Sequence, residues 1–310
     1  METLLNTSWP IARYRFEFIV TTCIRLPDYA GSTLRGAFGH ALRSVACMTK
    51  EKNCKQCPLY QDCAYTNIFE APAPEHHALQ KFSQIPNAYV FEPPPRGAKV
   101  YAPGQLLTFH LVLFGKANAR LSLVIFALQK AFAQEVGHGT ARLDKVWQET
   151  ETGDAQIYSE ESTSISRPHP EIRITTLPKE DEVVLSFSTP LRLQHNGKIL
   201  EPHEITASDV LMTLARRIGL IREFHCGQVL NLDYAGLKNK SLAVGFQQNL
   251  KWQSFTRYSN RQNRFLNYNG LVGECAFSRL DEIFLPLLVL GTWIHVGKGA
   301  TFGLGKYSIL

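Results

Sequence analysis

Residues 295–309 read HVGKGATFGLGKYSI and lie between a long apolar run and a short strand-like segment. Four glycines and two lysines fall within positions 297–306. Glycine permits positive φ and removes side chains that would block a close approach, and lysine adds positive charge. The composition therefore predicts a loop that lies against a phosphate backbone. Because it lacks the GKS or GKT ending of a P-loop and the GxGxxG order of a dinucleotide fold, a nucleotide cofactor is not expected.

The segments that precede this loop repeat one order of strands and helices twice. In the first half, apolar spacing predicts strands at 14–24, 87–91, 106–114 and 141–150, and helices at 31–46 and 119–135. In the second half, it predicts strands at 183–193, 242–258, 270–277 and 306–310, and helices at 207–224 and 279–294. Each half has the order β-α-β-β-α-β, so we expect an α+β fold of two tandem ferredoxin-like (RRM-like) domains. A single irregular α+β domain is the alternative.

The predicted domain boundaries follow from this order. The N-terminal ferredoxin-like domain spans 1–150 and contains a four-cysteine insertion at 47–63. The polar stretch 151–178 is the expected connection. The C-terminal domain spans 179–310 and contains a basic hairpin and the glycine-rich loop.

Positive charge gathers in the second half of the chain. Nine Lys or Arg and three Asp or Glu lie between positions 234 and 310, and this excess equals the whole net charge of +6. The pattern indicates a localised anion-binding face, with a solvated basic surface as the alternative. The longest apolar run, 283–294, is too short to span a bilayer. The N-terminus lacks the layout of a signal peptide, so a cytoplasmic location without membrane partners is expected.

Four of the seven cysteines are clustered, at Cys47, Cys54, Cys57 and Cys63. In a cytoplasmic chain this spacing favours a metal site over disulfides, because a two-residue gap forms a metal-binding turn and four thiolates complete a tetrahedral site. A structural zinc ion is the first expectation. An iron–sulfur cluster, which also uses four cysteines, is the second.

Three segments carry a resemblance to a known family: STLRGAFGHALR (32–43), RYSNRQ (257–262) followed by GLVG (270–273), and the glycine-rich loop. They resemble the RAMP superfamily of CRISPR-associated RNA-binding proteins, and within it the CRISPR pre-crRNA processing endoribonucleases. The resemblance implies a metal-independent cut in CRISPR repeat RNA by 2′-hydroxyl attack, which gives a 2′,3′-cyclic phosphate and a 5′-hydroxyl. It also implies pre-crRNA and other CRISPR effector subunits as partners. Many such endoribonucleases lack the cysteine cluster, so the chain departs here from the commonest pattern.

His40 is the best-placed catalytic candidate among ten histidines. On the expected helix, apolar residues define one face, and Gly36, His40 and Arg43 fall on the other. Gly36 and Gly39 are expected to leave that surface low enough for a ribose-phosphate to reach the imidazole. The resemblance places an essential histidine in this first helix, with His40 as general base or acid. Arg43 would stabilise charge on the phosphate, and Tyr29 would position groups or act as an acid. An ordinary exposed helix histidine is the alternative.

The hairpin at 251–265 interleaves cations with aromatic side chains, a pattern typical of contact with phosphates and unpaired bases. The expected RNA-binding residues share a cationic or glycine side chain and are Arg35, Arg257, Arg261, Arg264, Gly297, Lys298, Gly299, Gly303, Gly305 and Lys306. A non-catalytic crRNA-binding subunit of a CRISPR effector complex has the same fold and is the main alternative function. A redox-sensing role of the cysteine cluster in RNA binding is a further one.

Overall fold

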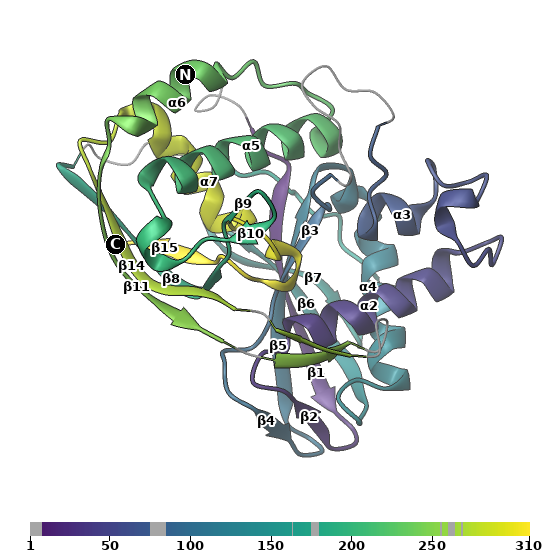
Figure 1. Ribbon diagram of the computed structural model, residues 1–310. Coiled ribbons are helices and arrows are strands. Elements are labelled where there is room, and N and C mark those ends of the chain that lie inside the picture. Colours follow the sequence, from purple (N-terminus) through teal and green to yellow (C-terminus); the bar gives the residue numbers. More distant parts are fainter. Residues whose placement is uncertain are drawn as a thin grey trace. The chain divides into compact units, whose positions relative to one another are not determined.

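The computed structural model describes residues 8–74, 85–162, 164–174, 180–254, 256–259, 264–267 and 269–310, with the two short pieces 256–259 and 264–267 described by their backbone. The chain divides into two compact units. The N-terminal unit comprises Trp9–Ile172 and Leu220–Gln228, and the C-terminal unit includes Arg173–Gly219 and Val229–Leu310. Each unit contains one main antiparallel sheet (Figure 1).

The N-terminal unit has a five-stranded sheet in the order β3-β5-β1-β6-β7. Its strands are β1 (Ile11–Val20), β3 (Tyr89–Glu92), β5 (Leu106–Phe114), β6 (Ala141–Thr150) and β7 (Gly153–Ser159), and its helices are α2 (Gly31–Ala46), α3 (Ala64–Phe69) and α4 (Leu121–Gln134). A separate ribbon pairs β2 (Ile24–Leu26) with β4 (Lys99–Tyr101). The order β1-α2-β3-β5-α4-β6 is the predicted β-α-β-β-α-β unit, and β7 adds an edge strand.

Alternation along β1 builds the core of this unit. Tyr14, Phe16 and Phe18 are fully buried, whereas the intervening side chains are half-buried on the opposite face of the sheet. The Phe16 ring stacks on Phe109 of β5 at 5.5 Å, and the Phe18 ring stacks on Phe132 of α4 at 4.0 Å between centroids. The apolar faces of α2 and α4 join the same core, so both helices are packed against the sheet (Figure 1).

Gly36 and Gly39 of α2, both predicted to leave the outer side of the helix open to a ligand, differ in their surroundings. Gly36 is exposed, and an added Cβ would meet nothing within 4 Å. Gly39 is buried, and an added Cβ would lie 2.1 Å from the Phe69 ring. The expectation is therefore wrong for Gly39, which lets α3 pack closely on α2.

We expect Gly39→Ala to destabilise the N-terminal unit by about 1–3 kcal/mol, because the methyl group overpacks the contact with Phe69. The matched change Gly36→Ala should stabilise it by about 0.5–1 kcal/mol through helix propensity alone. Urea denaturation of both variants measures the difference, and equal stabilities would contradict the close packing at Gly39.

The C-terminal unit has a four-stranded sheet in the order β11-β14-β8-β15. Its strands are β8 (Glu182–Leu191), β11 (Gly245–Gln253), β14 (Gly270–Ser278) and β15 (Tyr307–Ile309), with two small ribbons of β9 (Gln194–His195) with β10 (Lys198–Ile199) and β12 (Thr256–Ser259) with β13 (Arg264–Asn267). Its helices are α6 (Tyr234–Leu242), α7 (Leu285–Ile294) and the first part of α5 (Ala207–Cys226). The order β8-α5-β11-β14-α7-β15 is again β-α-β-β-α-β, which confirms the tandem ferredoxin-like fold.

Helix α7 is the apolar centre of the second unit. Seven of its ten residues are buried, and Pro286 lies in its first turn, where the missing N–H costs no hydrogen bond. The Tyr307 hydroxyl of β15 donates to the Leu288 carbonyl at 2.6 Å, and the Arg217 guanidinium of α5 donates to the Ile294 carbonyl at 2.9 Å. Burial lowers the pKa of Arg217 to about 10. The Arg217 bond fixes the end of α7 from which the glycine-rich loop departs, and the Tyr307 bond ties β15 to the first half of the helix.

The contacts place the boundary between the units at 172/173, whereas position 150 was predicted as the end of the first domain. Strand β7 lies within the stretch predicted as a connection and pairs with β6, from Thr150 opposite Gly153 to Lys145 opposite Ser159. The N-terminal unit thus uses part of the predicted connection as an edge strand.

Candidate functional site

His40 lies on the exposed side of α2, in the N-terminal unit. The helix turns Leu34, Phe38 and Leu42 into the core and leaves His40 exposed, as the 3.6-residue period requires. The open surface at Gly36 lies one turn before it. The imidazole is therefore accessible to a ligand that approaches the outer side of α2.

The two arginines near His40 have structural partners. Arg35 donates from Nε to the Tyr89 hydroxyl at 3.0 Å, and its guanidinium lies 4.2 Å from the centre of the Phe69 ring. Arg43 donates to the backbone carbonyls of Glu51 at 2.6 Å and Lys52 at 2.9 Å. Arg43 thus fastens the cysteine-containing loop to α2, which is a different role from the predicted contact with phosphate.

Tyr29 lies just before α2 and is 5% exposed. Burial raises the pKa of its phenol, and the nearby Glu92 adds to the shift. Since an α-helix rises about 1.5 Å per residue, the backbone of His40 lies about 13 Å along the helix from Gly31. The structure therefore does not bring the Tyr29 side chain to the surface that His40 shares with Gly36.

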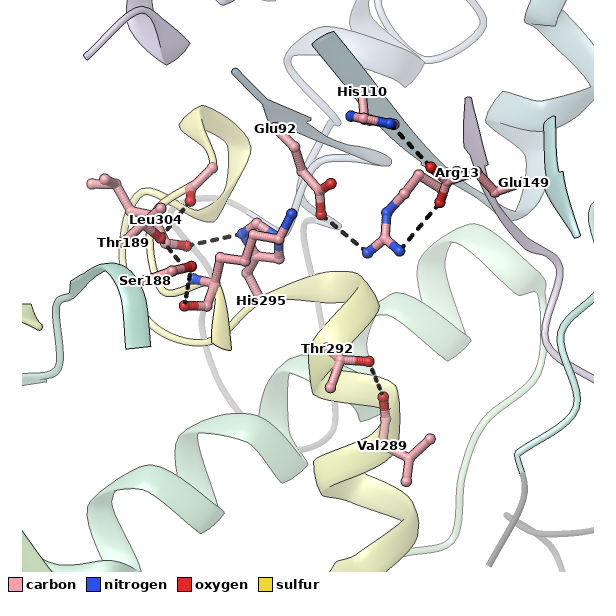
Figure 2. A network of polar contacts seen from close by, with 12 residues as sticks. Arg13, Glu92, His110, Glu149, Ser188, Thr189, Val289, Thr292, His295 and Leu304 are labelled. Carbon is pink, nitrogen blue, oxygen red and sulfur yellow. Dashed lines mark hydrogen bonds and ion pairs between the residues drawn. The ribbon is translucent and has the colours of Figure 1, made fainter. Parts of the chain in front are cut away.

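Sequence reasoning missed a polar network on the sheet face opposite α2 and α4 (Figure 2). Arg13 of β1 donates to the buried Glu92 of β3 at 3.1 Å and lies 3.5 Å from Glu149 of β6. His110 of β5 lies 3.0 Å from Glu149, Nε2 to Oε1. The alternation of β1 was the one signal that could have placed Arg13 on this face. The network contains a histidine that is accessible, because the His110 side chain is 30% exposed.

We expect Glu149→Gln to lower stability by about 1 kcal/mol at pH 7 and to have a smaller effect as pH falls through the lowered pKa of Glu149. The hydrogen bond from His110 lowers the pKa of Glu149. A lowered folded pKa contributes stability above the unfolded pKa, and that stability is lost as pH falls through the folded pKa. Urea denaturation at pH 7 and pH 3.5 measures the effect. The exposed Glu151→Gln is the control, and an equal loss at both pH values would contradict the pairing.

The glycine-rich loop of the C-terminal unit is fixed by backbone hydrogen bonds. Val296 N donates to Gly305 O at 3.1 Å, Gly305 N to Pro190 O at 3.0 Å, and Lys298 N to Arg192 O at 2.8 Å. The four predicted glycines all have positive φ: Gly297, Gly299, Gly303 and Gly305. Glycine is needed there because other residues strain in this region. The loop is thus a rigid structure that projects the exposed Lys298.

Lys306 and His295, which flank the glycine-rich loop, differ in their exposure. Lys306 is half-buried, and its N–H donates to the Thr189 hydroxyl at 2.8 Å. His295 is fully buried at the end of α7, with its Nδ1 3.3 Å from the Leu304 carbonyl oxygen (Figure 2). His295 is therefore buried and has no access to a ligand.

The structure describes part of the backbone of the predicted basic hairpin. Strands β11 and β14 pair from Gly245 opposite Ser278 to Gln253 opposite Gly270. Strands β12 and β13 lie between them in the sequence and pair with each other. In this second pair, Arg257 pairs with Leu266, and Ser259 pairs with Arg264. Arg261 lies outside the described residues. The hairpin thus carries Arg257 and Arg264 on its two strands.

The four clustered cysteines are half-buried free thiols that line one cavity of the N-terminal unit. Burial raises the pKa of the Cys54 thiol, and the Arg43 guanidinium opposes the shift. Among the described residues, no three His, Cys, Asp or Glu side chains lie close enough together to hold one metal ion.

None of the described helices is long and apolar enough to cross a membrane.

Comparison with known proteins matches a family model to each half of the chain. A family model described as an N-terminal domain matches residues 9–170, and the model of the CRISPR-associated endoribonuclease Cas6 matches residues 185–307. The two matches lie over the two ferredoxin-like repeats and together take in the His40 helix, the basic hairpin and the glycine-rich loop. The second half of the chain thus contains a domain of the CRISPR-associated endoribonuclease Cas6 family.

Individual relatives are distant in sequence and similar in fold. An uncharacterized protein of Archaeoglobus fulgidus is 22% identical over 290 residues, which cover 92% of each chain. The Thermus thermophilus Cas6 structure has a TM-score of 0.54 at 16% identity, covering 98% of this chain and 99% of its own. Its product complex has a TM-score of 0.58 at 16% identity, with 97% and 100% covered. A partial Cas6-RT-Cas1–Cas2 complex has a TM-score of 0.56 at 13% identity, with 97% of this chain and 46% of that chain covered. These likenesses show the tandem ferredoxin-like fold.

Proposed function

We propose that the protein is an endoribonuclease that cuts CRISPR repeat RNA without a metal ion, with His40 as the general acid or base. The 2′-hydroxyl of one nucleotide attacks the adjacent phosphate and expels the 5′-oxygen of the next. The products are a 2′,3′-cyclic phosphate and a 5′-hydroxyl. This reaction needs a proton acceptor at the attacking hydroxyl and a proton donor at the leaving oxygen, and histidine serves either role.

The observation that carries the proposal is the exposed imidazole of His40 beside the open surface at Gly36, in a chain whose second half contains a Cas6-family domain. A ribose-phosphate that lies across this part of α2 meets no side chain at Gly36. Tyr29 and Arg43 take no direct part in the proposed reaction, because Tyr29 is buried and Arg43 is bonded to the backbone of the cysteine loop.

The glycine-rich loop supports binding of an RNA backbone. Lys298 is exposed, and among the described residues the N–H groups of Gly299, Ala300 and Thr301 have no hydrogen-bond acceptor. Successive N–H groups that follow a left-handed residue form a concavity that suits a phosphate, and Gly299 is left-handed. The loop thus provides donors and a cation at one place.

The basic hairpin supports a second RNA contact. No acidic residue occurs between positions 234 and 273, so the charge of this segment is not neutralised by its own sequence. The predicted contacts of Arg257, Arg261 and Arg264 belong to this proposal. Arg35 takes no part in it, since its guanidinium is engaged by Tyr89 and Phe69. The similar Cas6 structures include a product complex and a Cas6-RT-Cas1–Cas2 complex, and we propose repeat RNA and CRISPR protein subunits as partners of this chain.

The proposal is tested by incubating the protein with the CRISPR repeat RNA of its host in the presence of EDTA and mapping the product ends. We expect one cut per repeat and a 2′,3′-cyclic phosphate at the upstream product. A cut that requires a divalent metal would contradict the mechanism. Tight binding without any cut would assign the chain to the non-catalytic crRNA-binding subunits.

A further inference from the structure

The cysteine cluster, defined as Cys47, Cys54, Cys57 and Cys63, surrounds a single cavity of about 350 Å³. The cysteines come from three places in the N-terminal unit. Cys47 follows the end of α2, Cys54 begins the short 3₁₀ turn at Cys54–Gln56 and Cys57 follows it, and Cys63 precedes α3. Elements separated by up to sixteen positions thus direct four thiol-bearing residues to the same cavity.

Local hydrogen bonds fix the backbone around the cavity. Cys57 N donates to Cys54 O at 3.1 Å, and the Asn53 side chain accepts from Lys55 N at 3.1 Å. Cys63 N donates to Leu59 O at 2.8 Å. The two-residue gap between the middle cysteines therefore forms a defined turn, as metal-binding turns do.

The cavity opens to solvent, because Met48 and Leu59 in its wall are 84% and 40% exposed. Apolar side chains such as Tyr65 line it together with the charged Glu51, Asp62 and Arg120. Four cysteine sulfurs around one cavity suit a soft metal centre.

Two such centres use four cysteine ligands. A single zinc ion requires four sulfurs each about 2.3 Å from one point. A cubane of four irons and four sulfides is bound by the same number of cysteines but holds the ligand sulfurs further apart around a larger body. The cavity of about 350 Å³ has room for the larger centre.

We propose that the cysteine cluster ligates a [4Fe–4S] cluster in this cavity. The four thiolates and the cluster carry net negative charge, and the guanidinium of Arg120 in the cavity wall offsets part of it. The cluster fastens the loop 47–63 to α2, to which Arg43 already binds that loop through Glu51 and Lys52. The proposal does not depend on RNA cleavage, because it is tested by metal content.

The test is the iron, sulfide and zinc content of the protein, purified without oxygen and then reconstituted with ferrous iron and sulfide. We expect about four irons and four sulfides per chain, together with a broad charge-transfer band in the visible spectrum. One zinc per chain that excludes iron would overturn the proposal in favour of the zinc site. Uptake of less than half a cluster after reconstitution would overturn it as well.

Cysteine variants locate the site. Cys57→Ser and Cys63→Ser should each lose at least three quarters of the bound iron and most of the visible band. The matched control is Cys23→Ser, a half-buried free thiol outside the cavity, which should keep the full content. Circular dichroism establishes that each variant is folded. Equal iron content in all three variants would show adventitious binding and would overturn the assignment.

Discussion

His40→Ala is expected to slow cleavage of repeat RNA by about 100- to 10,000-fold, which is the usual contribution of a general acid or base. RNA affinity should change less than about twofold, because the catalytic proton transfer contributes to the transition state and not to ground-state binding. Stability should also be unchanged, since His40 is exposed and fills no part of the core. Single-turnover cleavage and filter binding with the same RNA measure the two effects separately.

Two other histidines provide the controls for this experiment. His110→Ala removes the pairing with Glu149 and should leave cleavage within about threefold of the wild type. His195 is exposed in the C-terminal unit, and His195→Ala should have no effect on either measurement. If His110→Ala abolishes cleavage while His40→Ala does not, the catalytic assignment moves to the network of β1, β5 and β6. If no histidine variant slows cleavage, the mechanism with a histidine acid or base is wrong.

The parts of the fold that could be predicted are those in which one segment carries its own signal. The helix at 31–46 and the strands at 106–114 and 141–150 have the predicted bounds, because their apolar spacing follows the buried face of one helix or strand. The last helix begins at Leu285 and not at 279, since Asp281 caps a separate short turn through a bond from Ile283 N.

Strand β7 and helix α6 were not predicted, because they form through contacts with other segments and carry no apolar periodicity of their own. Strand β7 is polar and exposed over its first four residues, and its pairing with β6 is what makes it a strand. Helix α6 buries only Leu237 and Ser241, so it has no continuous apolar face. Its start is fixed by the Asp233 side chain, which accepts from Gly236 N, and its end by the ion pair of Lys240 with Asp281.

The candidate site also combines features that one segment predicts with features that depend on distant segments. The exposure of His40 follows from the apolar spacing of its own helix and could be predicted. The buried states of Tyr29 and His295, and the engagement of Arg43, depend on partners that a single segment does not reveal. The network of Arg13 with Glu92 joins residues 79 positions apart, and only the strand register brings them together.

Gly305→Ala is expected to destabilise the C-terminal unit by about 3–5 kcal/mol and to lower Tm by roughly 10–20 °C. Gly305 has φ +69°, and an added Cβ would lie 1.8 Å from the Val296 carbonyl oxygen. That carbonyl belongs to the backbone and has no rotamer into which to move, so the loop itself must shift. The bonds from Val296 N to Gly305 O and from Gly305 N to Pro190 O would then be lost. Thermal denaturation by circular dichroism measures the change.

Two controls separate the strain at Gly305, the backbone contact and the RNA contact. Gly197 has φ +81° with nothing within 4 Å of an added Cβ, so Gly197→Ala should cost only the strain of about 1–2 kcal/mol. Lys298 is exposed, so Lys298→Ala should leave Tm unchanged. That variant should reduce the slope of log affinity against log salt by about 0.7, the value for one phosphate contact to a single strand. Equal Tm values for the two glycine variants would contradict the close approach of Gly305 to Val296. An unchanged salt slope would remove Lys298 from the RNA contact while leaving the rigid loop in place.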